Sequence, residues 1–175
     1  MKLTVKNITR LALIAAAYAA LTVALMPISY GPVQMRVSEI LMVLPFFIPE
    51  SSVALAVGCF IANAFGGYGV LDMVFGSLAT FLSGVCMGKL GKSGGESFLT
   101  KMLALLMPVV FNAVFVGGTI AYATASAGAF AGLFALYALE VGAGELAVMA
   151  VLGIPAMIYL PKSRVMKYLK EQNMG

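Results

Sequence analysis

The chain has 175 residues, of which 62% are hydrophobic and only 10% are charged, and its mean hydropathy is +1.02. A soluble domain carries about 25% charged residues, so the composition excludes an ordinary soluble protein. It indicates an all-α membrane protein that forms one integral membrane domain over residues 1–175. The net charge of +4 comes from lysines that flank the apolar runs, and such charges do not imply nucleic-acid binding.

Residue usage also argues against metal and catalytic chemistry. The chain has no histidine, and its two cysteines, Cys59 and Cys86, lie in apolar runs without the spacing of metal ligands. We expect both cysteines to be small buried hydrophobic residues. Because no nucleophile and base can be paired, we expect no enzyme activity, and we expect no metal ion or cofactor.

Six apolar runs are long enough, or nearly long enough, to cross about 30 Å of hydrocarbon as helices. Ser38 is expected to cap the second span, and Ser51 or Ser52 the third. The second and third spans are short, so a re-entrant pair is the alternative to two crossings. Pro108 is expected to interrupt the fifth span, and Lys89–Lys101 to form the longest polar connection. The spans are expected at about 9–28, 38–47, 52–65, 71–88, 102–122 and 133–160.

The basic residues indicate the orientation of this six-helix topology. Six spans place both termini on one side, and lysine and arginine are enriched in cytoplasmic loops. We therefore expect cytoplasmic termini, a basic tail at about 162–175, and a multi-pass protein of the bacterial plasma membrane. Only Arg36 is left on the outer side. The cations expected in the cytoplasm are Lys2, Lys6, Arg10, Lys89, Lys92, Lys101, Lys162, Arg164, Lys167 and Lys170.

Four acids, Glu39, Asp72, Glu140 and Glu145, are expected at or inside the outer ends of the helices, beside Arg36. A charge near the bilayer centre costs about 2.5–3.5 kcal/mol on insertion scales, so these residues need a cavity or partners. Two local explanations remain open. Asp72 and Glu140 can extend to the membrane interface, and Arg36 can pair with Glu39 three residues later.

Glu145 is the strongest candidate for a functional residue. It is expected about one turn inside the last span, flanked by Gly142 and Gly144, where a backbone can approach a ligand closely. Together the four acids and Arg36 give the outer half a net charge of −3, which favours a cation.

Three amide side chains, Gln34, Asn63 and Asn112, add donors and acceptors at a similar depth. The two asparagines can instead hydrogen-bond between helices, worth about 1 kcal/mol. Carboxylates and amides would suit a planar, amidine-bearing heterocycle with an amine. The nearby aromatic residues are Tyr30, Phe65 and Tyr68, for which a position in the interfacial belt is an equal alternative.

The first span carries a strip of small residues, Ala12, Ala16 and Ala20, with Ala15 and Ala19 beside it. Small residues let helices approach closely in lipid, so the strip is expected to dock a partner or one of the protein's own helices. The chain has no energy-coupling site and is too short for two inverted transporter repeats. Transport would therefore need partner subunits or a homo-oligomer.

Three blocks of sequence resemble the QueT family, in its order and spacing, over about residues 8–160. The first is YGPVQMRVSEILMVLP at residues 30–45. The second comprises IAN at 61–63 and GVLDMVFGSLAT at 69–80, and the third VGAGE at 141–145 with LGIP at 152–155. Met35 and Ile40 depart mildly from the pattern, which leaves the substrate class intact.

The resemblance implies the substrate-binding (S) component of an energy-coupling factor (ECF) transporter, with six helices and an outward-facing pocket. The implied small-molecule substrate is a queuosine precursor such as 7-aminomethyl-7-deazaguanine. The implied partners are the transmembrane coupling subunit, which would dock on the alanine strip, and two cytosolic ATPases.

These expectations combine into a hypothesis for the site. Glu145, with Glu39 or Asp72, would pair with the guanidine-like edge and the ammonium of the substrate. Asn63 and Asn112 would read the amide edge of the ring. Arg36 would hold the loop after the first span to Glu39.

Three alternative functions remain open on the sequence. One is an S component for another vitamin, such as thiamine. A second is a small oligomeric cation channel with an outer ring of acids. The third, an intramembrane enzyme, is disfavoured because the chain offers no catalytic arrangement.

Overall fold

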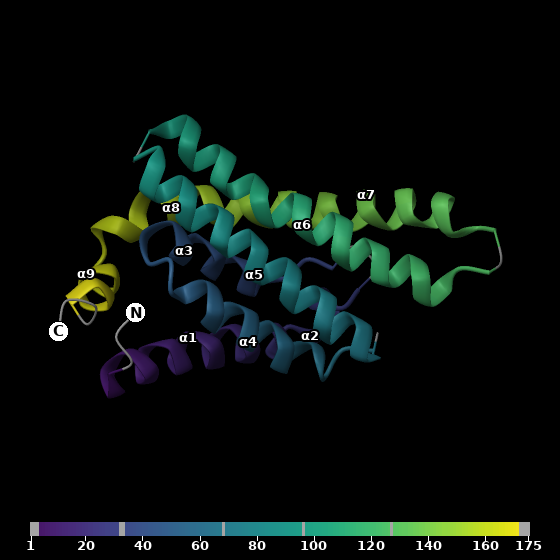
Figure 1. The fold of residues 1–175 in the computed structure, drawn as a ribbon, viewed down its shortest axis with the longest axis horizontal. Helices are drawn as coiled ribbons and strands as arrows, with labels where there is room; N and C mark the ends of the chain where they lie inside the picture. The colour runs from purple at the N-terminus through teal and green to yellow at the C-terminus, as the bar shows by residue number, and fades with distance from the viewer. Residues whose placement is uncertain (1–3, 32–33, 68, 96, 127, 172–175) are drawn as a thin grey trace.

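The computed structural model of the chain describes residues 4–31, 34–67, 69–95, 97–126 and 128–171. Every regular element in these ranges is helical, as Figure 1 shows. The elements are α1 (Val5–Ala24), α2 (Met26–Ser29), η1 (Val37–Val43), α3 (Leu44–Phe47), α4 (Ser51–Asn63), α5 (Gly69–Ser93), α6 (Phe98–Thr124), α7 (Phe130–Val148), η2 (Met149–Gly153), α8 (Ile154–Tyr159), η3 (Leu160–Lys162) and α9 (Arg164–Glu171).

Among the described residues, four helical stretches are long and apolar enough to cross a membrane. They are α1, α5, α6 and the continuous run Phe130–Lys162, which joins α7, η2, α8 and η3. Two shorter apolar stretches, Val37–Phe47 and Ser51–Asn63, correspond to the expected second and third spans. The protein is thus an all-α membrane protein, and the prediction that these two spans are short is confirmed.

Small residues let consecutive helices lie close together. A Cβ atom added to Gly58 on α4 would lie 2.6 Å from the carbonyl oxygen of Ala15 on α1. One added to Gly117 on α6 would lie 2.8 Å from the backbone of Ala138 on α7. Because backbone atoms occupy these places, only glycine permits these two approaches. The α6–α7 hairpin that results projects beyond the ends of α4 and α5 (Figure 1).

The predicted serine caps are wrong. Ser38, Ser51 and Ser52 lie inside the first turns of η1 and α4, after Arg36 and Glu50 at the cap positions. The hydroxyls of Ser51 and Ser52 donate instead to the carbonyls three residues earlier, at 2.7 Å each. Serine can bond backbone carbonyls as readily as it caps, so the pattern did not distinguish the two uses.

Two predicted interruptions are also wrong. Helix α5 continues to Ser93 and α6 begins at Phe98, so Lys89 and Lys92 lie on a helix and the connection is short. Pro108 lies inside an unbroken α6. A local widening occurs at Pro155, which cannot donate a backbone hydrogen bond. Pro155 comes just after the π-helical segment η2, at whose end the backbone N–H of Ile154 donates to the carbonyl of Met149, five residues earlier.

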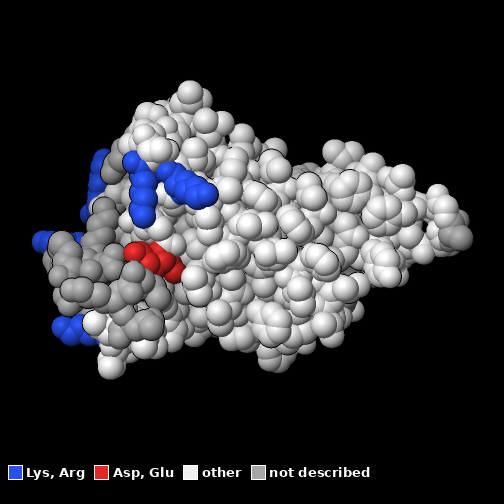
Figure 2. All heavy atoms as spheres, in the orientation of Figure 1, with Lys and Arg blue, Asp and Glu red and all other residues white. Residues whose placement is uncertain are grey.

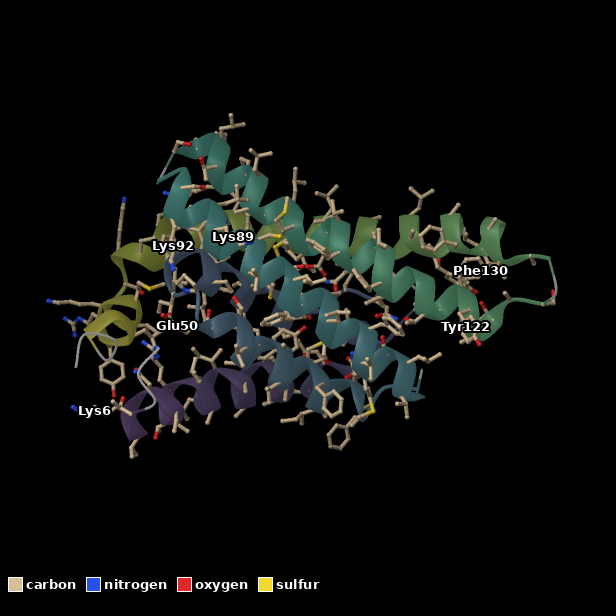
Figure 3. All side chains as sticks on the ribbon, viewed as in Figure 1. Lys6, Glu50, Lys89, Lys92, Tyr122 and Phe130 are labelled. Atoms are coloured by element: carbon tan, nitrogen blue, oxygen red, sulfur yellow. The ribbon has the colours of Figure 1, made fainter. Side chains whose placement is uncertain are left out.

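Positive charge gathers at one end of the molecule. The start of α1, the end of α5, the start of α6 and all of α9 lie together there (Figure 1). Figure 2 shows the lysines and arginines of one face clustered at that end, beside an acidic residue, and the rest of the face without charged residues. In Figure 3, Lys6, Lys89 and Lys92 lie toward it, whereas Tyr122 and Phe130 lie at the far end. This is the asymmetry that the sequence predicted; Lys2 lies outside the described residues, as does the side chain of Lys170.

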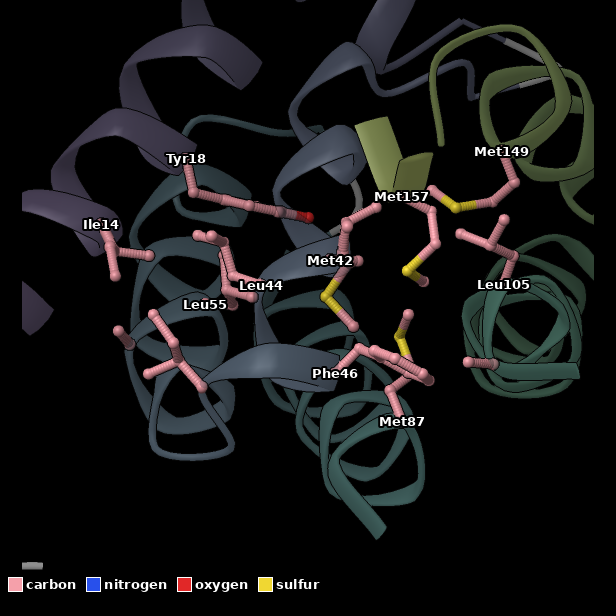
Figure 4. Close-up of a cluster of buried hydrophobic side chains, with 14 of the residues drawn as sticks. Ile14, Tyr18, Met42, Leu44, Phe46, Leu55, Met87, Leu105, Met149 and Met157 are labelled. Carbon is pink, nitrogen blue, oxygen red and sulfur yellow. The ribbon is translucent and has the colours of Figure 1, made fainter. Parts of the chain in front are cut away.

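The apolar core is rich in methionine. Met42, Met87, Met149 and Met157 are buried around Leu55 and Leu105, as Figure 4 shows. Unbranched methionine side chains fill the irregular spaces left by short helices and a widened turn. The core also includes Tyr18, whose hydroxyl donates a hydrogen bond to Glu39, one of the polar side chains described next.

Candidate functional site

Arg36 is buried at the centre of a cluster of polar side chains within the helix bundle. It precedes η1, and its guanidinium donates to the side-chain oxygen of Gln34 at 2.8 Å (Nη2–Oε1). The same nitrogen lies 3.8 Å from Oδ2 of Asp72, an ion pair too long for a hydrogen bond. Its other terminal nitrogen contacts the sulfur of Cys59 at 3.7 Å, and the guanidinium lies 5.8 Å from the centre of the Tyr30 ring.

Helices α4 and α5 hold the Asp72 side of the cluster. Asn63 at the end of α4 donates from Nδ2 to the carbonyl of Asp72 at 2.9 Å and contacts the sulfur of Cys59 at 3.6 Å. Gly76 makes room for this amide, because an added Cβ would lie 2.5 Å from Asn63 Nδ2. The sequence correctly placed Cys59 in the interior but gave no sign that its sulfur contacts polar groups.

A second acid, Glu39, is held by a residue that sequence reasoning missed. The hydroxyl of Tyr18 on α1 donates to Oε1 of Glu39, and both side chains are fully buried. One turn along α1, Thr22 and Ser38 share a hydrogen bond of 2.6 Å. The spacing of Tyr18 and Thr22, four residues apart in an apolar span, was the available signal for a polar helix face.

Glu145 and Asn112 complete the cluster from the long α6–α7 hairpin. They line a narrow void with Gln34, Arg36 and two valines. The gap between these side chains admits no water-sized sphere. Glu145 is 2% exposed.

The predicted depth of Glu145 in its helix is wrong. Helix α7 begins at Phe130, so fifteen residues, or about 22 Å of helix, precede Glu145. Because the hairpin projects beyond α5, a residue in the middle of α7 lies beside Arg36, which pairs with Asp72 in the first turn of α5. Gly142 packs toward Ala113 of α6, where an added Cβ would lie 3.3 Å away, so it serves helix packing.

Many polar atoms in the cluster have no hydrogen-bond partner among the described residues. Most are acceptors: Oε2 of Glu39, Oε1 of Glu145, both carboxylate oxygens of Asp72, and the amide oxygens of Asn63 and Asn112. The unpartnered donor beside them is Nε2 of Gln34. Because buried polar atoms are normally paired, this excess of acceptors suits a ligand that brings several donors.

Some predicted site residues lie elsewhere. The expected Arg36–Glu39 ion pair is wrong, since Arg36 pairs with Asp72 and Glu39 bonds Tyr18. Glu140 is half-buried, and five residues along a helix turn it about 140° away from Glu145, so the structure does not bring it to the cluster. Phe65 is 60% exposed, and Tyr68 lies outside the described residues.

The alanine strip lies on the outer surface of α1. Ala12, Ala16 and Ala20 are all exposed, whereas Ala15 and Ala19 are buried. The close approach of Gly58 to Ala15 shows that the buried pair packs against α4. Within the described residues, the strip itself is therefore not used for packing between the protein's own helices.

Two larger grooves open on the surface, but both are apolar. One, of about 490 Å³, lies between α1, η1 and α9 at the basic end. The other, of about 610 Å³, is lined mainly by aromatic residues of α5, α6 and α7. Neither groove is lined by a carboxylate, whereas the Arg36 cluster contains those of Glu39, Asp72 and Glu145.

Comparison with known proteins gives a consistent family match. The family model described as the QueT transporter matches residues 8–162 of the chain. The chain is 40% identical over 78 residues to the "Queuosine precursor transporter QueT" of Lactococcus lactis subsp. cremoris (strain MG1363). This alignment covers 43% of the chain and 46% of the relative's length, which is less than half of each. No solved structure matches the chain significantly.

Proposed function

Because this chain belongs to the QueT transporter family, a family of transporters and not of enzymes, we propose that it binds a cationic queuosine precursor. The proposed ligand is 7-aminomethyl-7-deazaguanine or a close relative, taken up from outside the membrane. The chain would act as the S component of an ECF importer and deliver the ligand with the help of ATP-driven partners.

The excess of buried acceptors is the observation that carries this proposal. Three buried carboxyl groups, those of Glu39, Asp72 and Glu145, lie in a cluster with one guanidinium, that of Arg36, whose ion pair is with Asp72. A ligand that fits must supply positive charge and N–H donors, since an anion would be repelled by the cluster. An aminomethyl-deazaguanine offers an ammonium group and the donor edge of a guanine-like ring.

The positions of the acids support a division of roles. Glu145 would accept the N–H groups of the guanidine-like edge, a two-point contact that fixes the orientation of the ring. Glu39 or Asp72 would hold the ammonium. The amide oxygens of Asn63 and Asn112, which have no partner among the described residues, would accept from the remaining ring donors.

The arrangement of the helices supports a six-helix topology with cytoplasmic termini. The beginning of α1 and the end of the chain's helical part lie at the same, basic end. The positive-inside rule assigns that end to the cytoplasm. The cluster includes Asp72 in the first turn of α5, whose last turn lies at the basic end, and Glu39 and Asn63 from the two short apolar stretches.

The exposed alanine strip supports docking to a transmembrane coupling subunit, which would transmit the work of two cytosolic ATPases. Lipid gives helices no hydrophobic reason to associate, so association depends on close contact between surfaces. Ala12, Ala16 and Ala20 present such a surface, and they are exposed in the isolated chain.

Calorimetric titration of the detergent-purified chain tests the ligand. Saturable binding is expected with 7-aminomethyl-7-deazaguanine and not with guanine or thiamine. Thiamine binding alone would indicate an S component for that vitamin. If none of the three ligands produces heat, and the chain in a planar bilayer conducts cations without ATPases, the proposed function is wrong.

A further inference from the structure

We propose that Arg36 is an internal substitute for the cationic substrate: its guanidinium fills the site of the empty protein and is displaced by the ligand. This inference rests on the proposed function, because it concerns the same site. It assigns Arg36 a role in specificity that differs from holding a loop or contacting the ligand.

The chemistry of the guanidinium matches the chemistry that the site requires. It is a planar cation with several N–H donors, and it is 3% exposed. It contacts Asp72 and Gln34 on one side, the sulfur of Cys59 on another, and the face of the Tyr30 ring. These are contacts that a planar, cationic heterocycle could also make.

The space available shows that something must move before a ligand enters. The void beside Arg36 and Glu145 does not hold even a water-sized sphere. Its walls on α6 and α7 belong to helices whose backbones nearly touch at Gly117, so they cannot separate locally. Gln34 and Arg36 instead precede η1 on non-helical backbone, with φ of +47° at Gln34.

Of the residues that line the void, Gln34 and Arg36 are therefore the ones that can move without breaking a helix. Their side chains are joined by a 2.8 Å hydrogen bond, so they would leave the site together. Their departure would enlarge the void on the side that faces Asn112 and Glu145.

Charge then determines which ligands can displace Arg36. When the guanidinium leaves, Asp72 loses its partner in the ion pair. A buried carboxylate without a counter-charge is strongly unfavourable. A cationic ligand restores the balance, whereas a neutral ligand of the same shape does not. The exchange thus makes the site select for a positive charge.

The test compares the affinities of two ligands for wild type and Arg36→Gln by calorimetry. The ligands are 7-aminomethyl-7-deazaguanine and the neutral 7-methyl-7-deazaguanine, which lacks only the amine. Arg36→Gln removes the internal competitor, so both ligands should bind at least tenfold more tightly than to wild type. Arg36→Lys keeps a competing cation and should stay within about threefold of wild type. Arg10→Gln, a second buried arginine at the basic end, is the matched control and should leave both affinities unchanged.

Two results would overturn the inference. Weaker binding of both ligands to Arg36→Gln would mean that Arg36 contacts the ligand or supports the site. If Arg10→Gln tightens ligand binding as much as Arg36→Gln does, loss of any buried arginine produces the effect.

If Arg36→Gln does not fold, Gln34→Ala replaces it in the test. This variant loosens Arg36 without leaving Asp72 unpaired, and we expect about threefold tighter binding of the ligands. If wild type and all variants bind neither ligand, the proposed function itself fails, a result distinct from weakened binding in Arg36→Gln alone.

Discussion

Glu145 provides the sharpest test of the proposed site. Replacing it with glutamine keeps the shape of the side chain and removes its charge. Glu145 is 2% exposed and its Oε1 has no partner among the described residues, so water does not weaken the contact that it offers. A charge-assisted hydrogen bond is worth about 1.5–3 kcal/mol. Glu145→Gln should therefore weaken binding of 7-aminomethyl-7-deazaguanine by about ten- to a hundredfold.

The matched control lies on the same helix. Glu140 is also a glutamate of α7, but it is half-buried and faces about 140° away. Glu140→Gln should change the dissociation constant by less than about twofold, because it removes an equal charge outside the cluster. Calorimetry on wild type and both variants measures the three affinities. Unchanged affinity in Glu145→Gln, or equal losses in both variants, would refute the assignment of Glu145 to the ligand.

Three further predictions concern α1 and its neighbours. Tyr18→Phe leaves the buried Glu39 without its hydrogen bond and should cost about 1–3 kcal/mol of stability. The loss should lower the melting temperature in detergent, whereas Tyr122→Phe, at the exposed far end, should leave the melting temperature unchanged. Gly58→Ala places a methyl against a backbone carbonyl and should cost about 1–3 kcal/mol; a melting temperature equal to wild type would contradict the close α1–α4 contact. Ala16→Leu should spare ligand binding and abolish uptake by cells that supply the partner subunits; surviving uptake would exclude the strip as the docking surface.

The sequence predicted the helical class and the charge asymmetry well because both depend on composition and on hydropathy along the chain. Two of the expected helix ends were short by two or three residues. The fifth span was expected to end at about 122 and the sixth to begin at about 133, whereas α6 continues to Thr124 and α7 begins at Phe130. Alanine favours helix strongly, and a hydropathy average does not register that preference.

Pairing between distant residues was the part that the sequence could not supply. It correctly selected Arg36, Glu39 and Asp72 as buried charges that need partners, but proposed the nearest pair along the chain. The observed partner of Arg36 is Asp72, and that of Glu39 is Tyr18. Spacing rules describe neighbours on one helix, whereas these pairs join separate elements whose approach depends on glycines such as Gly76.

Helix α1 links the two halves of the proposed mechanism, because its two faces serve different purposes. Tyr18 points inward and fixes Glu39, while Ala16, half a turn earlier, lies on the outer surface. In the proposed mechanism, a ligand that rearranges the Arg36 cluster would act on the same helix that would contact the coupling subunit. If the two faces are coupled, saturating ligand should change the affinity for the coupling subunit, and by reciprocity the subunit should change ligand affinity by the same factor. Equal ligand affinity with and without the bound subunit would show that α1 carries both surfaces without connecting them.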